Sequence, residues 1–294
     1  MALATYLLDT NALSYLFDHA TVSKEDLAQV VMKLENHSHN PPLVLGNVEA
    51  LDELLGVAVQ DPDRMAWLRT HLPLIYKRHI VKPWQERCRL EIKNGSPLST
   101  EDSMMDRQTC DEVIALWAEG KTAPELSAEV RKRKELYKEG RDEAAVGALG
   151  RVQPKGHPEM PNSATRKQAE RHFKEFAEHR QSWFVETWWK NRRELRLSDD
   201  VESWPRVENL PCNHAVLSYN LTKIYERLCL GIKDDPADSY DVGHFADACC
   251  TEFLVTSDGR LVRTCERAPY RPSKVIAFEE FVRRVLINHP QTTA

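Results

Sequence analysis

Four acidic residues stand where apolar stretches end or helices begin, and these residues are the best placed to do chemistry. Asp9 directly follows the apolar stretch LATYLL, and Asp258 comes just after EFLVT. Asp241 opens a helical pattern, and Glu53 lies on the helix expected after a second strand. Ligands of open α/β sheets bind outside the carboxyl ends of the strands. If the elements share one sheet, the four carboxylates are therefore expected to converge at that edge.

Carboxylates gathered in one pocket require a counter-charge. Two of them about 4 Å apart repel by roughly 4 kcal/mol at an effective dielectric constant near 20. Such a group either takes up protons or recruits a cation. Ligands that are all oxygen suit Mg²⁺ or Mn²⁺, which keep several waters and also bind phosphate oxygens. An ion of this kind can activate water for attack on a phosphodiester. The acids alone thus predict phosphate chemistry.

The elements that must position these acids follow from hydrophobic periodicity and from turn and cap residues. Strands are expected at 3–8, 43–45, 252–256 and 274–278. Helices are expected at 12–17, from Ser23 to about 35, at 48–59, from Asp61-Pro62 onward, and at 166–196, 213–231, 241–250 and 278–286. The Gly- and Pro-rich stretch 144–165 is typical of a loop or linker. Strands that alternate with helices predict an α/β fold with a mainly parallel sheet covered on both faces.

The motifs around these acids resemble those of PIN-domain nucleases. YLLDTNALSYL (6–16) resembles their opening strand and first acid, and NVEALDELLG (47–56) resembles their second motif. DVGHFADACCTEFLVTSDGRL (241–261) is similar to their third and fourth motifs. The resemblance implies a Rossmann-like fold. It also implies that Asp9, Glu53, Asp241 and Asp258 bind the metal, with Thr10, Asn11 and Ser257 as hydrogen-bonding support.

The chain departs from the usual PIN pattern in two ways. Glu53 and Asp241 are 188 residues apart, so a large helical insertion is expected between the two parts of the domain. We predict a PIN-like segment at 1–90, a partly basic helical insertion at 91–235, and the rest of the PIN-like domain at 236–294. Glu49, one helical turn before Glu53, is an alternative or additional ligand, and Asp247 is a further candidate.

These acids also have plainer interpretations. Asp9 and Asp241 suit helix caps, Asp258 suits a turn, and Glu53 suits a solvated helix position. His244 is interpreted as a packed or hydrogen-bonded helix residue rather than as a catalyst.

The resemblance implies an enzyme, a Mg²⁺- or Mn²⁺-dependent endoribonuclease. Many bacterial members of the family are toxins restrained by antitoxins, so an inhibitory or activating protein partner is a further expectation beside the RNA substrate. Two alternatives stay open: a catalytically silent PIN-like scaffold that binds RNA or protein, and a metal-dependent phosphatase. Haloacid-dehalogenase-type phosphatases are disfavoured because Asn11 stands where their second Asp should follow the first.

Charge is distributed unevenly along the 294 residues. The net charge is −5, yet 131–196 holds 17 Lys and Arg against 10 Asp and Glu. Basic residues can neutralise phosphates, and interleaved aromatics can stack on bases; the simpler alternative for the aromatics is the buried face of an amphipathic helix. The predicted nucleic-acid contacts are Arg166, Lys167, Arg171, Lys174, Lys190, Arg192 and Arg193.

Composition favours a cytoplasmic protein. Seven cysteines lack paired C-x-x-C spacing, which favours buried, reduced thiols over disulfides or zinc. The N-terminal stretch has no basic region or cleavage site and is predicted to be a strand rather than a signal peptide. No apolar run approaches the roughly 18–20 residues of a membrane helix, so no membrane partner is expected.

Overall fold

The computed structural model describes most of the chain in five stretches. They are residues 4–37, 43–57, 61–119, 163–233 and 238–288. Residues 131–134, the basic run RKRK, lie outside them, as does nearly all of the predicted linker at 144–165.

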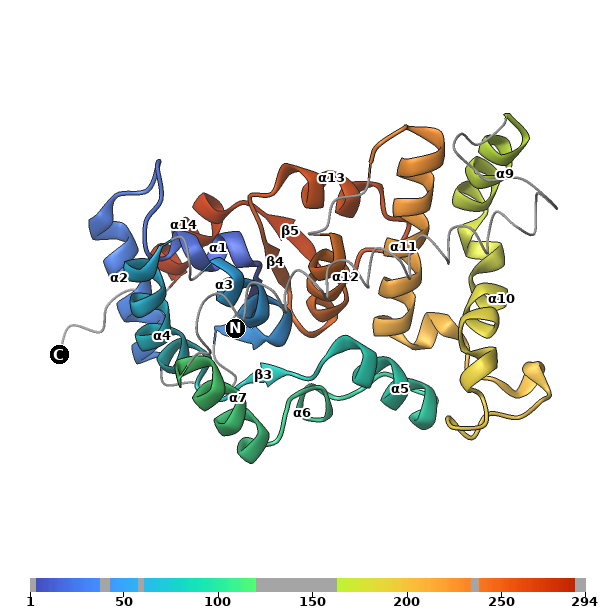
Figure 1. Ribbon diagram of the computed structural model, residues 1–294, viewed down its shortest axis with the longest axis horizontal. Coiled ribbons are helices and arrows are strands. Elements are labelled where there is room, and N and C mark those ends of the chain that lie inside the picture. The colour runs from blue at the N-terminus through green and yellow to red at the C-terminus, as the bar shows by residue number, and fades with distance from the viewer. Residues whose placement is uncertain (1–3, 38–42, 58–60, 120–162, 234–237, 289–294) are drawn as a thin grey trace.

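Five short strands form one parallel sheet (Figure 1). They are β1 (Tyr6–Leu8), β2 (Val44–Asn47), β3 (Ile80–Val81), β4 (Phe253–Val255) and β5 (Lys274–Ile276). Their order is β3-β2-β1-β4-β5, and every neighbouring pair is parallel. In the pairing of β1 with β4, Leu7 lies opposite Leu254 from the other end of the chain. The predicted α/β class and mainly parallel sheet are therefore confirmed.

Helices connect the strands and extend the molecule to one side of the sheet (Figure 1). The α-helices are α1 (Thr10–Tyr15), α2 (Lys24–Asn36), α3 (Val48–Val57), α4 (Pro62–Tyr76), α5 (Trp84–Asn94), α6 (Thr100–Ser103), α7 (Arg107–Glu119), α9 (Ser163–Lys174), α10 (Phe176–Trp188), α11 (Pro211–Cys229), α12 (Asp238–Asp247), α13 (Gly259–Arg267) and α14 (Phe278–Asn288). Short 3₁₀ turns are η1 (Trp189–Asn191), η2 (Val201–Ser203), η3 (Val207–Asn209) and η4 (Ala248–Cys250). As expected, Ser23 caps α2, accepting a hydrogen bond from the Asp26 N–H at 3.1 Å.

Both faces of the sheet are buried. Tyr6 and Leu8 of β1 lie in an apolar core that includes residues of α1, α2, α3, α4, α7 and α14. Leu7 points the opposite way, into a second core with α11, α12 and α13. Alternation along a strand sends successive side chains to opposite faces. With both faces occupied by apolar groups, the strand ends are left as the places for polar chemistry.

Three predicted elements differ in the structure. The helix expected from Asp61-Pro62 onward is α4. It ends at Tyr76, its C-cap Lys77 has the left-handed conformation with φ 49°, and the strand β3, which was not predicted, follows. The predicted order placed no helix between β4 and β5, but α13 lies there. It provides the crossover that two parallel strands require. The single helix expected at 166–196 is divided at Glu175 into α9 and α10.

The residues between β3 and β4 pack directly on the sheet core at several points. Cys110 and Trp117 of α7 belong to the core on the α1 face, and Ala215 and Tyr219 of α11 belong to the opposite one. The domain boundary predicted at 90/91 falls inside α5, and the one at 235/236 falls outside the described residues. The division into three segments stays a prediction.

The seven cysteines are free thiols, as expected. Within the described ranges, no helix combines the length and apolar character needed to cross a membrane.

Candidate functional site

Two of the predicted acids follow the adjacent strands β1 and β4, between which the strand order of the sheet reverses. β1 and β4 are neighbours, and the strands that follow each in sequence extend the sheet to opposite sides. In such sheets this switch point forms the ligand crevice. Asp9 follows β1, and its backbone N–H donates to the Val255 carbonyl of β4 at 3.1 Å. Asp258 follows β4 and caps α13, accepting from the N–H groups of Arg260 at 2.6 Å and Leu261 at 3.3 Å.

Asp9 is buried although its side chain is acidic, and hydrogen bonds hold both of its carboxylate oxygens in place. Its side chain is 3% exposed. One carboxylate oxygen caps α1 by accepting from the Ala12 N–H at 2.7 Å, and the other accepts from the Thr256 hydroxyl. Burial raises the pKa of Asp9, while the charge of His244 and these two hydrogen bonds act against that rise.

Thr256 connects the two strand-end acids. Its hydroxyl donates to Asp9 and accepts from the Asp258 backbone N–H at 3.0 Å. The sequence prediction gave this supporting role to Ser257, but the Ser257 side chain is exposed and makes no hydrogen bond to the described residues. The pattern Thr-x-Asp at the end of a strand was the available signal for Thr256.

Glu53 meets α1 and α12 beside these acids. Asn47, at the end of β2, starts α3 by accepting from the Ala50 N–H at 2.6 Å. Glu53 lies farther along α3, where it accepts a hydrogen bond from the Thr10 hydroxyl at 2.5 Å. Its carboxylate is 3.9 Å from Nε2 of His244, which is 1% exposed.

Thr10 therefore supports Glu53 through its side chain rather than supporting Asp9. The side chain of Asn11 is exposed and makes no hydrogen bond to the described residues.

His244 is a site residue that the sequence prediction undervalued. Burial lowers its pKa, but the nearby carboxylate of Glu53 and the charges of Asp9 and Asp241 outweigh this effect, so its pKa is raised. In its protonated form the imidazole offsets part of the negative charge around it. Its spacing of three residues from Asp241 on one helix was the only signal in the sequence, since positions three apart share a helix face.

Asp241 is half-buried on the first turn of α12. Burial raises its pKa to about 8; His244 opposes this shift, and the charges of Asp238, Asp258 and Glu53 add to it. Since Asp9 and Glu53 also influence each other, the four predicted acids form a continuous electrostatic series: Asp9, Glu53, Asp241 and Asp258.

The ligand atoms of these residues are of the type that a hard divalent cation binds, but they lie too far apart to bind one together. The series supplies only oxygen ligands. Burial is the main cause of the raised pKa values of Asp9 and Asp241, neighbouring carboxylates add to it, and a cation would offset the cost of both. Within the described part of the chain, however, three ligating atoms lie within 4.8 Å of one another only at Glu175, Glu178 and His179 of the α9–α10 region. Binding a metal at the sheet edge would therefore require the carboxylate oxygens to move closer together.

The alternative second acid, Glu49, belongs to a separate inner group. Burial and the nearby charge of Asp247 of α12 raise the pKa of Glu49, and Arg87 of α5 donates through Nη2 to Oδ1 of Asp247. Arg87 and Asp247 are 2% and 0% exposed. Neither was predicted in this role, and Arg87 carried no sequence signal because Asp247 is 160 residues away in the chain. The structure gives Glu53, not Glu49, the contacts with Thr10 and His244.

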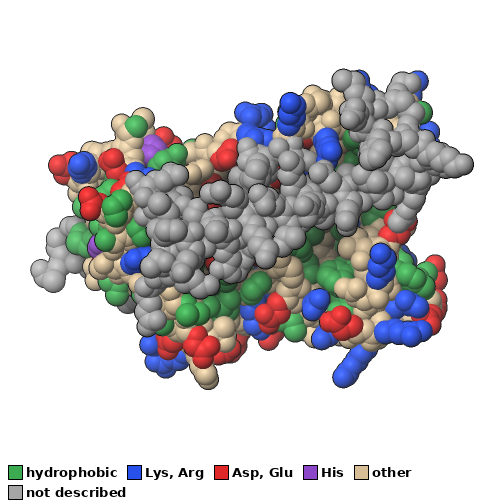
Figure 2. All heavy atoms as spheres, viewed as in Figure 1, with side chains coloured by type: hydrophobic (Ala, Val, Ile, Leu, Met, Phe, Trp, Pro, Cys, Tyr) green, Lys and Arg blue, Asp and Glu red, His purple; other side chains and the backbone are tan. Residues whose placement is uncertain are grey.

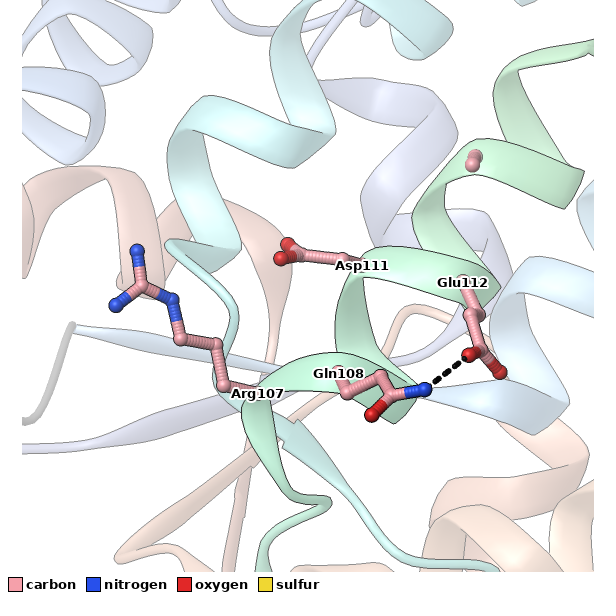
Figure 3. Close-up of a pocket in the computed structure, with 5 residues that line it drawn as sticks. Arg107, Gln108, Asp111 and Glu112 are labelled. Carbon is pink, nitrogen blue, oxygen red and sulfur yellow. Dashed lines mark hydrogen bonds between the residues drawn. The ribbon is translucent and has the colours of Figure 1, made fainter.

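The surface depression shown in Figure 3 lies elsewhere. It is lined by α7 residues, among them Arg107, Asp111 and Glu112. None of the strand-end acids lines it.

The basic helices lie beyond α11 from the sheet (Figure 1). Most predicted nucleic-acid contacts are exposed, and Lys and Arg are interspersed with acidic side chains on the face shown in Figure 2. Lys174 pairs with Glu170 at 2.7 Å, and the half-buried Arg192 pairs with Asp199 at 2.5 Å. Arg166, Lys167, Arg171, Lys190 and Arg193 form no ion pair with described residues.

The aromatics of this region mainly serve packing. Phe176 and Phe184 are buried, and Phe173 stacks on Tyr225 of α11 with ring centres 4.2 Å apart. Even the exposed Trp189 has Arg192 over its ring, at 4.1 Å. These contacts favour the interpretation of a buried helix face over that of open stacking platforms.

Comparisons with protein-family models, curated proteins and solved structures found no match to this chain.

Proposed function

We propose that the protein is a metal-dependent endoribonuclease of the PIN type, with its active site at the carboxyl edge of the sheet. The observation that carries the proposal is the Thr256 bridge between Asp9 and Asp258 at the β1/β4 switch point. Asp241 and Glu53 are electrostatically coupled to this pair. The sequence motifs that resemble PIN nucleases select the same four residues.

The protein's own groups have distinct tasks in this proposal. Asp9, Asp241, Asp258 and Glu53 would hold one or two Mg²⁺ or Mn²⁺ ions, which supply an activated water and stabilise the leaving oxygen of a phosphodiester. Thr256 fixes the Asp9 carboxylate toward Asp258, and burial keeps Asp9 from turning into solvent. Deprotonation of Asp241, with its pKa of about 8, accompanies loading because a metal binds the carboxylate form.

His244 has a charge-balancing task. Its imidazolium offsets the carboxylates around it, and a divalent cation at the same place would compete with that positive charge. Metal binding is therefore expected to release protons from both Asp241 and His244.

The choice of RNA as substrate rests on the family resemblance and on the exposed basic residues of α9 and α10. These residues lie beyond α11 from the acids (Figure 1), so they would hold a nucleic acid at a distance from the cleavage site. An inhibitory or activating protein partner stays an expectation from the resemblance.

A catalytically silent RNA- or protein-binding scaffold is the second candidate. It is favoured by one observation: no three oxygens of the four acids lie within 4.8 Å of one another in the described structure. A scaffold of this kind would bind RNA without needing a divalent ion. A metal-dependent phosphatase, the other alternative, would act on a small phosphate ester.

Cleavage of a labelled RNA pool in Mn²⁺, Mg²⁺ or EDTA tests the proposal. Wild type is expected to cut with either metal and not with EDTA, and Asp9→Asn, which keeps the helix cap, is expected to lose cutting. Equal cutting by both proteins would contradict the site. RNA binding without cutting would support the scaffold, and activity on p-nitrophenyl phosphate alone would support the phosphatase.

A further inference from the structure

Helices α3 and α12 meet through two layers of polar groups. The outer layer is the proposed site, where Glu53 faces His244 with Oε2 and Nε2 3.9 Å apart. The inner layer lies along the same two helices and joins Glu49 to Asp247. Since Glu49 is one turn before Glu53, and Asp247 is three residues after His244, the inner contact determines how the outer residues face each other.

The backbone of α12 is shaped for this inner contact. A Cβ atom on Gly243 would lie 2.4 Å from Cγ of Glu49, a separation that real structures do not tolerate. Glu49 therefore packs directly over the backbone of the residue next to His244. The absence of a side chain at Gly243 brings α3 close enough to α12 for Glu53 to reach His244.

The inner carboxyl groups have one counter-charge between them. Oε2 of Glu49 and Oδ2 of Asp247 are both buried and have no hydrogen-bond partner among the described residues. A proton held on Glu49 and donated to the Asp247 carboxylate would satisfy both atoms, in agreement with the raised pKa of Glu49, which is caused first by burial and then by the charge of Asp247. Arg87 then balances the one remaining negative charge.

Each of the three nitrogens of the Arg87 guanidinium group donates a hydrogen bond. Besides Asp247, its Nη1 donates to Sγ of Cys250 at 3.1 Å and its Nε donates to the Lys82 carbonyl at 3.1 Å. The Lys82 carbonyl directly follows β3, and Cys250 lies at the end of η4. A buried ion pair adds little net stability, but removing one partner leaves a costly unpaired charge. The ion pair of Arg87 and Asp247 is therefore better suited to hold the helices in a fixed arrangement than to stabilise the fold.

We propose that Arg87, acting through Asp247 and Glu49, is a positioning residue that sets the spacing of α3 and α12 and so aligns Glu53 with His244 and Asp241 for metal binding. The inference rests on the proposed function for its metal-binding consequence, although the helix spacing itself does not. Misplacement of a catalytic group by about 1 Å can cost about a hundredfold in rate, so an indirect residue of this kind has a measurable effect.

The chain offers a matched control on the same helix. Glu91 of α5 is also buried, at 2% exposure, and ties α5 to α11 by accepting from the Cys212 N–H at 3.0 Å and the Asn213 N–H at 3.1 Å. It makes none of the contacts with Asp247 or Glu49. Glu91→Gln is therefore expected to lower stability without altering the α3–α12 spacing.

The experiment measures Mn²⁺ affinity by electron paramagnetic resonance, together with thermal unfolding, for full-length wild type, Arg87→Met, Arg87→Lys and Glu91→Gln. Loss of a supporting contact behind a metal site typically costs about 10–100-fold in affinity. We expect a loss of that size in Arg87→Met, partial recovery in Arg87→Lys, and wild-type affinity in Glu91→Gln at a lowered melting temperature. Wild-type affinity in Arg87→Met, or an equal loss in Glu91→Gln, would overturn the inference.

The inference can still be tested if Arg87→Met does not fold or if wild type binds no Mn²⁺. If Arg87→Met does not fold, Arg87→Lys decides alone: it keeps the charge but cannot make all three contacts, and unchanged Mn²⁺ affinity would contradict the inference. If wild type binds no Mn²⁺, the proposed function fails, and crystal structures of the same variants test the spacing. The separation of Glu53 and His244 should then exceed 3.9 Å in the Arg87 variants and stay at that value in Glu91→Gln.

Discussion

At the scale of single residues, the hydroxyl of Thr256 has the most specific task. It is buried, donates to Asp9 and accepts from the backbone of Asp258. A group that bonds in both directions cannot be replaced by a purely apolar one without leaving a buried partner unsatisfied. The geometry of the two strand-end acids therefore depends on a neutral side chain between them.

Replacing Thr256 by Val is expected to destabilise the protein by about 1–3 kcal/mol, because Asp9 and the Asp258 N–H lose their shared partner. It is also expected to weaken Mn²⁺ binding by about 10–100-fold. Chemical denaturation and metal titration measure the two effects. Ser257→Ala, at the exposed neighbouring position, should stay within about 0.5 kcal/mol of wild type; an equal loss there would contradict the account of Thr256.

The raised pKa of Asp241 predicts a pH dependence of stability. Its folded-state pKa of about 8 lies above the ordinary value of 3.8, so the folded protein holds this proton more tightly than the unfolded chain. The resulting stability is present at low pH and is lost as the pH rises through about 8. In EDTA, the melting temperature of Asp241→Asn relative to that of wild type should therefore be higher at pH 9 than at pH 5. Parallel profiles for the two proteins would count against the shift, and added Mn²⁺ should favour wild type at high pH.

At the scale of elements, the site depends on how α3 and α12 approach each other. Gly243 permits this approach because Glu49 occupies the space of its missing Cβ. In the interior of an exposed helix, Gly→Ala normally gains stability. Here the local helix preference and the packing act in opposite directions, and the 2.4 Å contact decides the sign.

Gly243→Ala is expected to destabilise the protein by about 1–3 kcal/mol through overpacking, and to weaken Mn²⁺ binding by separating Glu53 from His244. Gly259→Ala is the matched control. Gly259 begins α13, and its added Cβ would lie no closer than 3.4 Å to Arg263. Thermal unfolding of both variants provides the comparison, and a neutral Gly243→Ala would show that the helices can separate at no cost.

Sequence patterns predicted the elements well where local rules act alone. The capping by Ser23, the strands before Asp9 and Asp258, and the helix after Asp9 followed from periodicity and cap residues, whereas the helix after Asp258 was not predicted. The two-residue strand β3 could not be found in this way because so short a segment has no period. The position of Arg87 was equally hidden, since Asp247 approaches it only after α12 packs against α5.

At the scale of the whole molecule, the acids and the basic helices are separate regions joined by α11 (Figure 1). The acid series lies at one edge of the sheet, whereas α9 and α10 pack on the far side of α11. The charge division visible in the sequence therefore corresponds to a division in space. Substrate binding and cleavage should be separable by mutation.

Charge reversal by substituting Glu for Arg166, Lys167 and Arg171 together is expected to weaken RNA binding and to leave Mn²⁺ affinity unchanged. Loss of three phosphate contacts on a single strand should reduce the slope of log affinity against log salt by about 2. Fluorescence anisotropy at several salt concentrations measures this slope. The control reverses Lys24, Arg107 and Arg283, exposed residues of α2, α7 and α14; equal weakening there would show that net charge alone governs binding.

The central claim, that the strand-end acids form a divalent-metal site, is tested most directly by anomalous diffraction from crystals soaked in Mn²⁺. We predict an anomalous peak at bonding distance, about 2.0–2.2 Å as for comparable ions, from Asp9 and from Asp241 or Asp258, and its loss in Asp9→Asn. A peak only at Glu175, Glu178 and His179, or no peak at saturating Mn²⁺, would contradict the account.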